Sequence, residues 1–132
     1  AYYSREAVEF VIDNVLTAKP ISPALREQVI EDSLKGSAGA KAGWPGIEMS
    51  EDISQEVAAI KVPVTIICGE RDQVDNPSSL QRELLPRIPH ATMVILPDTG
   101  HLSPLESPAE IACRLTVFAT SIENGSLVQQ FD

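Results

Sequence analysis

The sequence predicts an α/β fold in which two parallel strands with flanking helices follow a mostly helical first part. Two apolar runs carry the prediction, residues 62–68 and 91–96. Each run is almost continuously apolar rather than alternating, which is typical of parallel strands covered by helices on both faces. A helical pattern lies between the two runs, as a crossover connection between parallel strands requires.

Helix signals come first along the chain. Residues 4–17 carry apolar side chains at helical spacing, and Ser4 has the residue type favoured at an N-cap. Ser22 and Pro23 match the preferences of an N-cap and a first helical position, so we expect a second helix there. Gly36 is expected to end it. The amino-terminal part of the chain is therefore predicted to be helical.

Shorter elements connect this part to the strands. Residues 37–49 are small and turn-rich, which predicts one short helix and a loop. A further short helix is expected at about 51–59. Between the strands, Asn76-Pro77 is expected to open the crossover helix.

The last helix has a strong start signal. Ser107, Pro108 and Glu110 have the spacing of a capping box with proline in the first turn. Residues 123–126, with the sequence Glu-Asn-Gly-Ser, are expected to break this helix and to leave a loose tail.

Composition limits the partners of the chain. The 132 residues are 43% hydrophobic and 22% charged, which suits one small globular domain or a fragment of a larger one. A net charge of −9 argues against nucleic acid and anionic lipid as partners. No apolar run is long enough to span a membrane and no signal-peptide pattern opens the sequence, so we expect no membrane partner and a cytoplasmic location.

The cysteines and histidines indicate a reducing compartment and no metal site. Cys68 and Cys113 lie in apolar stretches, which fits a packing role in a reducing compartment better than a disulfide. The histidines are His90 and His101, and neither has metal-ligand spacing around it. With no glycine-rich phosphate loop or dinucleotide fingerprint either, we expect no metal and no cofactor.

An acid and a histidine follow the two predicted strands. Asp72 comes three residues after Gly69, which ends the first strand, and His101 comes directly after Gly100 beyond the second. Parallel neighbours end at the same edge of a sheet, where open α/β folds place their sites. An aspartate that accepts from one ring nitrogen leaves the other free to take a proton from a nucleophile or water. The pair therefore predicts nucleophilic catalysis.

Other interpretations of these loops stay open. Each of the two residues alone is also a common turn residue or helix cap. Asp75 is the nearest rival for the acid and Asp98 is a weaker one, because it belongs to the same turn as His101. Glu70 and Arg71 could pair with each other in solvent and receive no role.

At this point the chain resembles the α/β-hydrolase family. Residues 69–72 resemble the family's acid loop, and residues 97–101 with 102–108 resemble its histidine loop and final helix. The resemblance implies that Asp72 is the acid of a catalytic triad and that His101 is its base. It also implies a fold that is the carboxyl-terminal part of a hydrolase sheet.

The resemblance divides the chain into a helical cap or lid segment at residues 1–50 and the carboxyl-terminal part of the hydrolase core at 51–132. The G-x-S-x-G nucleophile elbow of the family is missing. Residues 36–39 lack its spacing, and Ser103 is expected to belong to a turn. The chain alone is therefore expected to be inactive, with the nucleophile on a missing amino-terminal part.

The substrate is less defined. A small ester-like molecule is the first expectation, with lactones and carbon–carbon bonds as relatives of the same chemistry. An aspartate as the missing nucleophile would instead indicate dehalogenase or epoxide-hydrolase chemistry. Trp44 and Leu102 are assigned to substrate contact, and Met49 with Tyr2 or Tyr3 could line a pocket beneath the cap. Large apolar residues of this kind are more often packing anchors.

A second hypothesis belongs to a different class. Two strands alone leave unpaired edges, and the apolar run 62–68 is a poor open edge. We therefore predict that residues 61–132 alone are not a stable monomer. The partner is either the amino-terminal half of a hydrolase or another copy of the chain. In the second case the protein is a non-catalytic interaction module that oligomerises through its exposed strand.

Overall fold

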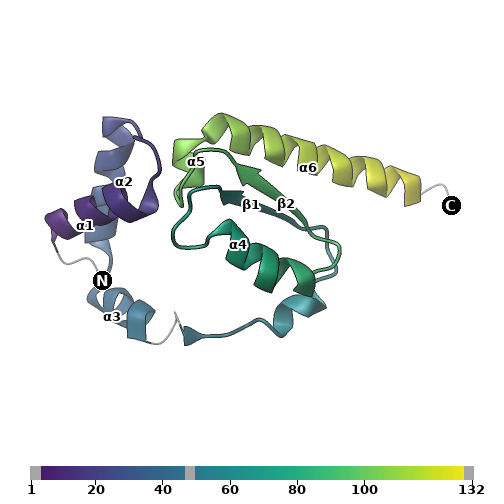
Figure 1. The fold of residues 1–132 in the computed structure, drawn as a ribbon, viewed down its shortest axis with the longest axis horizontal. Coiled ribbons are helices and arrows are strands. Elements are labelled where there is room, and N and C mark those ends of the chain that lie inside the picture. Colours follow the sequence, from purple (N-terminus) through teal and green to yellow (C-terminus); the bar gives the residue numbers. More distant parts are fainter. Residues whose placement is uncertain (1–3, 47–49, 130–132) are drawn as a thin grey trace.

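The computed structural model describes residues 4–46 and 50–129. Two groups of elements follow each other along the chain (Figure 1). Helices α1 (Arg5–Val11), α2 (Pro23–Lys35) and α3 (Ala38–Gly46) form the first group. In the second group, strands β1 (Thr65–Gly69) and β2 (Thr92–Leu96) lie between the region of helix α4 (Pro77–Ser79) on one side and helix α6 (Pro108–Gln129) on the other. The fold class predicted from the sequence, two parallel strands with flanking helices after a helical segment, is confirmed.

The first two helices begin where their caps predict. Helix α1 (Arg5–Val11) continues into a π-helical turn, η1 (Ile12–Leu16), and the Ser4 hydroxyl accepts from the Ala7 amide. Helix α2 (Pro23–Lys35) is capped by Ser22 and ends at Gly36. A small core lies between them, formed by Val8, Ile12 and Ile30 with Leu16, Val29 and Leu34 packed around it.

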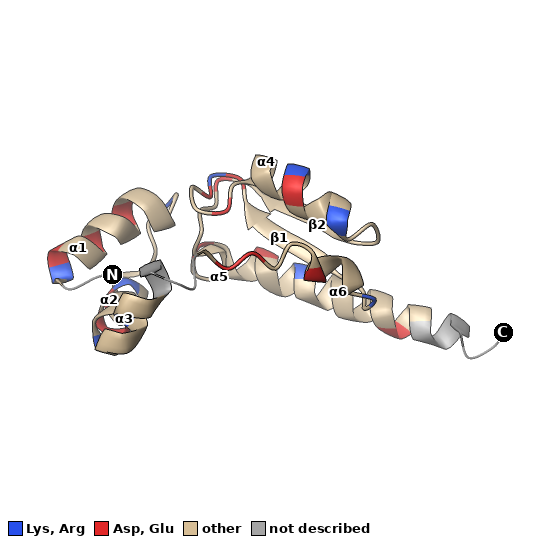
Figure 2. Ribbon diagram, turned by 90° about the horizontal axis from the view of Figure 1, so that it is seen from below, with Lys and Arg blue, Asp and Glu red and all other residues tan. Residues whose placement is uncertain are grey.

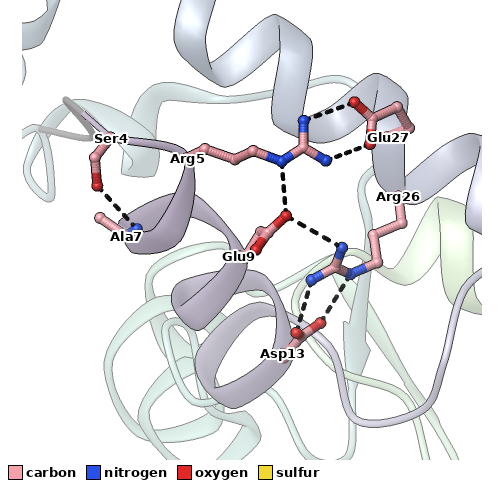
Figure 3. Close-up of polar contacts among 7 residues, drawn as sticks. All are labelled: Ser4, Arg5, Ala7, Glu9, Asp13, Arg26 and Glu27. Carbon is pink, nitrogen blue, oxygen red and sulfur yellow. Dashed lines mark hydrogen bonds and ion pairs between the residues drawn. The ribbon is translucent and has the colours of Figure 1, made fainter.

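Two arginines join these helices on their polar side (Figure 3). Arg5 reaches Glu9 at 2.9 Å and also contacts both carboxylate oxygens of Glu27 on α2. Arg26 of α2 contacts Asp13 at 2.8 Å and Glu9 at 3.8 Å. Exposed ion pairs contribute about 0–1 kcal/mol each. The apolar contacts between α1 and α2 are therefore expected to stabilise this helix pair more than the exposed ion pairs do.

The connection to the strands is less helical than predicted. Helix α3 (Ala38–Gly46) is present, but residues 51–59 contain a short 3-10 helix, η3 (Glu56–Ala59), in place of the expected longer helix. The Asp52 side chain accepts from the Ser54 amide, an Asx-type turn that competes with helix formation.

Strands β1 (Thr65–Gly69) and β2 (Thr92–Leu96) pair in parallel, with Thr65 opposite Thr92 and Gly69 opposite Leu96. Strand β1 begins three residues later than the predicted start at residue 62. Residues 62–64 include Pro63, which has no backbone amide to donate to a strand ladder. Within the described residues β1 pairs with β2 and with no other strand. Its second edge is open in this part of the chain.

The crossover between the strands is one irregular helical stretch. Asn76 caps helix α4 (Pro77–Ser79) through a bond from the Ser79 amide, as predicted. A π-helical turn, η4 (Leu80–Leu84), and a 3-10 turn, η5 (Leu85–Arg87), complete it.

A loop of residues 97–102 leads from β2 to helix α5 (Ser103–Glu106), and Ser107 separates α5 from the last helix, α6 (Pro108–Gln129). The predicted break at residues 123–126 is wrong, because α6 continues through Gly125. A glycine inside a helix costs only about 1 kcal/mol relative to alanine, and this stretch contains no proline. The Ser107 hydroxyl bonds Thr99 and Lys19 rather than serving the predicted capping box.

Charged residues are spread over many elements rather than gathered on one of them (Figure 2). No helix in residues 4–46 and 50–129 combines the length and the apolar character that a membrane crossing needs.

The two cysteines have different environments. Cys68 is buried, as predicted, but the packing role predicted for Cys113 is wrong, since Cys113 is exposed on α6. Burial raises the pKa of the Cys68 thiol, and the nearby Asp72 and Asp75 carboxylates raise it further. A raised pKa and burial both make the Cys68 thiol a poorer nucleophile than an exposed thiol.

Thiol labelling checks this assignment. In the native chain, Cys113 is expected to react with iodoacetamide at least about tenfold faster than Cys68, because the thiolate is the reactive form and access is required. Peptide mass mapping at timed intervals measures both rates. A Cys113→Ser variant is the control and should lose the fast phase. Equal rates at the two positions in the folded chain would contradict the burial of Cys68.

Candidate functional site

Asp72 is held rigidly just beyond the end of β1. Its backbone amide donates to the Gly69 carbonyl, which closes the turn after the strand. One carboxylate oxygen, Oδ1, accepts from the amides of Val74 at 2.8 Å and Asp75 at 2.9 Å. The residue is 8% exposed. These bonds fix the direction of the carboxylate before any partner is considered.

The electrostatics of Asp72 favour its ionised form. Burial alone would raise the pKa of this carboxyl, but bonds from the Asp75 amide, the His101 ring and the Val74 amide outweigh burial together. The pKa therefore lies below its ordinary value. At neutral pH Asp72 is an anion that can only accept hydrogen bonds.

His101 faces this anion from the loop after β2. Its Nδ1 lies 3.0 Å from Oδ2 and 3.2 Å from Oδ1 of Asp72. Because the carboxylate can only accept, the proton is assigned to Nδ1, and Nε2 of the neutral ring then carries a lone pair. The predicted meeting of these two side chains at one sheet edge is confirmed.

The rival acids are placed differently. Asp75 approaches His101 to 4.0 Å, and its side chain is 64% exposed. Asp98 lies in the left-handed backbone region at φ 46° and pairs with Arg71 at 2.6 Å. Of the three candidate acids, Asp72 is the one within hydrogen-bond distance of the imidazole.

Glu70 and Arg71 both bond Asp98 rather than each other. Glu70 accepts from the Asp98 amide at 2.9 Å, and the Arg71 guanidinium contacts the Asp98 carboxylate. Asp98 has a positive φ, and its amide and its carboxylate each bond a residue of the loop after β1. Glu70 and Arg71 therefore tie the two loops that carry Asp72 and His101.

A cavity of about 190 Å³ adjoins the pair and is lined by Asp72, Asp75, His101 and Ser103 on its polar side, with Leu80 and the end of β1 on the other. Ser103, expected in a turn, is the first residue of α5. The cavity is small, so it can hold a few waters or a small group rather than a whole substrate.

The predicted substrate contacts are not gathered here. Leu102 lies at the start of α5, where its amide donates to the Leu16 carbonyl at 3.0 Å, and it is not among the residues that line the cavity. Trp44 belongs to α3, but its side chain lies outside the described residues, as do Tyr2, Tyr3 and Met49 entirely. A role in substrate contact stays a prediction for each of them.

Sequence reasoning missed Glu106. This carboxylate is 8% exposed and accepts from the backbone amides of Gly100, Ala18 and Lys19. The sequence showed only that Glu106 lies within residues 102–108, the stretch that follows the predicted histidine loop. A position along the chain does not indicate which distant backbone amides a carboxylate will bond. Within the described residues, no three His, Cys, Asp or Glu side chains gather as a metal site.

Acid sensitivity checks the environment of Asp72. A carboxyl whose pKa is lowered on folding stabilises the folded state above its unfolded pKa of about 3.9, and this contribution is lost as the pH falls through the folded value. The urea concentration at the unfolding midpoint should therefore decrease as the pH is lowered below about 4. In Asp72→Asn this decrease should be smaller.

The matched control is Asp75→Asn, which removes an exposed carboxyl three residues away. This control should keep the profile of the unmodified chain. Parallel profiles for the unmodified and Asp72→Asn chains would contradict the lowered pKa of Asp72.

Similarity to known proteins can now be compared with this geometry. No protein-family model matches the chain. The chain is 31% identical over 104 residues to the AB hydrolase superfamily protein YisY of Bacillus subtilis (strain 168), a stretch that covers 78% of this chain and 38% of that protein.

Solved structures show the same fold. A bacterial membrane phospholipase A superposes with a TM-score of 0.76 at 23% identity, over 92% of this chain and 40% of its own. The serine hydrolase CarC, involved in carbazole degradation, superposes with a TM-score of 0.73 at 17% identity, over 90% of this chain and 48% of its own. The carboxylesterase CesB of Bacillus subtilis superposes with a TM-score of 0.69 at 19% identity, over 89% of this chain and 42% of its own. The chain thus spans less than half the length of each of these relatives.

Proposed function

We propose that this chain, which belongs to the α/β-hydrolase superfamily, is the carboxyl-terminal part of a serine-type hydrolase that acts on a small ester-like substrate. One observation carries the proposal: Nδ1 of His101 lies within 3.2 Å of both carboxylate oxygens of a buried, ionised Asp72. In this proposal Asp72 is the triad acid and His101 is the base. The nucleophile lies on a part of the protein that precedes residue 1.

The geometry suits both proton transfers of an acyl-transfer reaction. Nε2 of His101 removes the proton from the attacking serine, and the Asp72 anion stabilises the imidazolium that forms. The same nitrogen then delivers that proton to the leaving alkoxide as the acyl-enzyme forms. Water repeats the sequence to release the acid. The side chain of His101 is 31% exposed, so the ring is open to a reacting group while it stays bound to Asp72.

Residues 1–50 are proposed as the cap or lid of this enzyme. The carboxyl ends of β1 and β2 point toward α1 and α2 (Figure 1). Gln73 and Leu102, from the loops after the two strands, bond the carbonyls of Asn14 and Leu16. Helical segments therefore lie at the sheet edge that carries Asp72 and His101, where a lid would control access.

The upstream part is proposed as the partner of β1. The chain covers 38% of its superfamily relative, and β1 has an open edge within the described residues. Val62, just before β1, is 66% exposed despite its apolar side chain. We also keep the cytoplasm as the proposed compartment, since both thiols are free.

Two measurements test the proposal in order. Intact-mass analysis of material from the natural source shows whether these residues continue upstream. Hydrolysis of p-nitrophenyl esters is then compared between the 132-residue chain and the longer protein. Turnover is expected from the longer protein alone. Turnover by the short chain that disappears in His101→Ala would place the nucleophile within these 132 residues and overturn the division of the triad.

The open edge of β1 also favours a second candidate, a non-catalytic module that pairs this strand with another copy of the chain. Size-exclusion chromatography with light scattering separates the two. A homodimer of the natural-length protein without esterase activity would support the module, whereas an active protein of greater length supports the hydrolase.

A further inference from the structure

Glu106 is a buried carboxylate whose two oxygens bond different parts of the chain. Oε2 accepts from the Gly100 amide at 2.8 Å. Oε1 accepts from the Ala18 amide at 2.6 Å and the Lys19 amide at 3.2 Å. A buried anion needs such donors, because leaving it unpaired costs several kcal/mol. The side chain therefore holds the histidine loop and residues 16–19 at the same time.

The two backbones also approach each other closely. A methyl group added at Gly100 would lie 2.7 Å from the Ala18 nitrogen and 2.9 Å from the Leu16 carbonyl oxygen. The Leu102 amide donates to that same carbonyl at 3.0 Å. Gly100 and Leu102 flank His101, so both neighbours of the imidazole-bearing residue contact the 16–19 segment directly.

The other end of this segment belongs to the helical part. Leu16 is the last residue of η1, and it packs against the core that Val8, Ile12 and Ile30 form between α1 and α2. A shift of these helices must therefore move residues 16–19. The bonds at Glu106 would pass that shift to the loop on which His101 stands.

We propose that Glu106 is a positioning residue that couples the 16–19 segment to the placement of His101 against Asp72. This inference rests on the proposed function, in which that placement sets the activity of the base and the helices form a lid. Glu106 touches no reacting atom in this role. A Glu106 side chain that only packs would stabilise the fold without linking the two backbones.

Hydrogen exchange of the unmodified chain tests the link without any substitution. In the peptides that contain residues 16–19 and 99–102, the amides of Ala18, Lys19 and Gly100 should show the same free energy of opening, because the Glu106 carboxylate accepts from all three. Exchange is followed by mass spectrometry on the full chain in its native association state. Unequal opening free energies for these amides would overturn the proposal.

A spectroscopic readout then tests the placement of the ring. Histidine labelled with ¹⁵N gives signals from His90 and His101 alone, and the Nδ1 and Nε2 shifts report the tautomer that Asp72 fixes. In Glu106→Gln, we expect the His101 signals to lose this tautomer signature while those of His90 stay in place. Exchange at residues 16–19 and 99–102 should rise by at least about tenfold, as for the loss of a hydrogen bond to a charged group.

Glu110→Gln is the matched control, since Glu110 is an exposed carboxylate one turn further along the chain. It should leave both histidines and both peptides unchanged. A folded Glu106→Gln chain with an unchanged His101 signature would overturn the proposal, and if this variant does not fold, the exchange of the unmodified chain decides. Neither measurement uses catalysis, so a failed esterase assay would count against the proposed function and leave this test intact.

Discussion

Replacing His101 by alanine in the complete enzyme is expected to lower kcat/KM for p-nitrophenyl ester hydrolysis by about 10³-fold or more. The substitution removes the general base, and the serine hydroxyl is a weak nucleophile without it. Asp72→Asn should cost about 10⁴-fold in kcat, since an amide can donate to Nδ1 and so favour the wrong tautomer. Initial rates at saturating and limiting substrate separate the effects on kcat and KM.

Each substitution has a control within the same chain. His90→Ala removes the other histidine, whose ring nitrogen Nε2 lies 2.8 Å from the Val62 carbonyl oxygen. Asp75→Asn removes the rival acid, which lies 4.0 Å from the imidazole. Both controls should keep activity within a few-fold of the unmodified enzyme. A larger loss in Asp75→Asn than in Asp72→Asn would reassign the triad acid.

The sequence predicted the meeting of Asp72 and His101 because local rules were enough. Continuously apolar runs indicated parallel strands, Gly69 and Gly100 marked their ends, and parallel strands end at one edge. The register of the two strands confirms this logic. No long-range detail was required, since the covalent chain delivers both side chains to the same edge.

The features that the sequence missed depend on contacts between distant segments. Glu106 bonds amides of residues 18 and 19, and Glu70 and Arg71 both bind Asp98 across the two loops. Neither partner choice follows from spacing along the chain. The continuation of α6 beyond residues 123–126 was missed for a different reason: a glycine weakens a helix by an amount that its neighbours can offset.

The strongest stability effect is expected at Gly69. This glycine does not need its flexibility, because its φ is not positive. It needs space: a methyl group there would lie 2.3 Å from the Thr99 carbonyl oxygen and 2.4 Å from that of Gly100. Both obstacles are backbone atoms, so no side-chain rotation relieves the overlap. Gly69→Ala should therefore lower the free energy of unfolding by about 3 kcal/mol or more.

Gly125→Ala adds the same methyl group at a position where there is open space around it. Gly125 lies inside α6, and a methyl group added there meets no atom within 4 Å. Alanine is favoured over glycine in a helix by about 0.5–1 kcal/mol, so this variant should be more stable than the unmodified chain. Urea unfolding followed by circular dichroism, at one fixed protein concentration, measures both differences.

The two glycine substitutions are expected to change the free energy of unfolding in opposite directions, and this comparison tests the packing of the site. Gly69 contacts the carbonyl groups of Thr99 and Gly100, so its substitution pushes apart the loops that carry Asp72 and His101. A loss of stability in Gly69→Ala with a gain in Gly125→Ala ties the fold to that loop contact. If Gly69→Ala matched the unmodified chain in its urea midpoint, the two loops could not pack as closely as they do here, and the imidazole could not be held against the carboxylate.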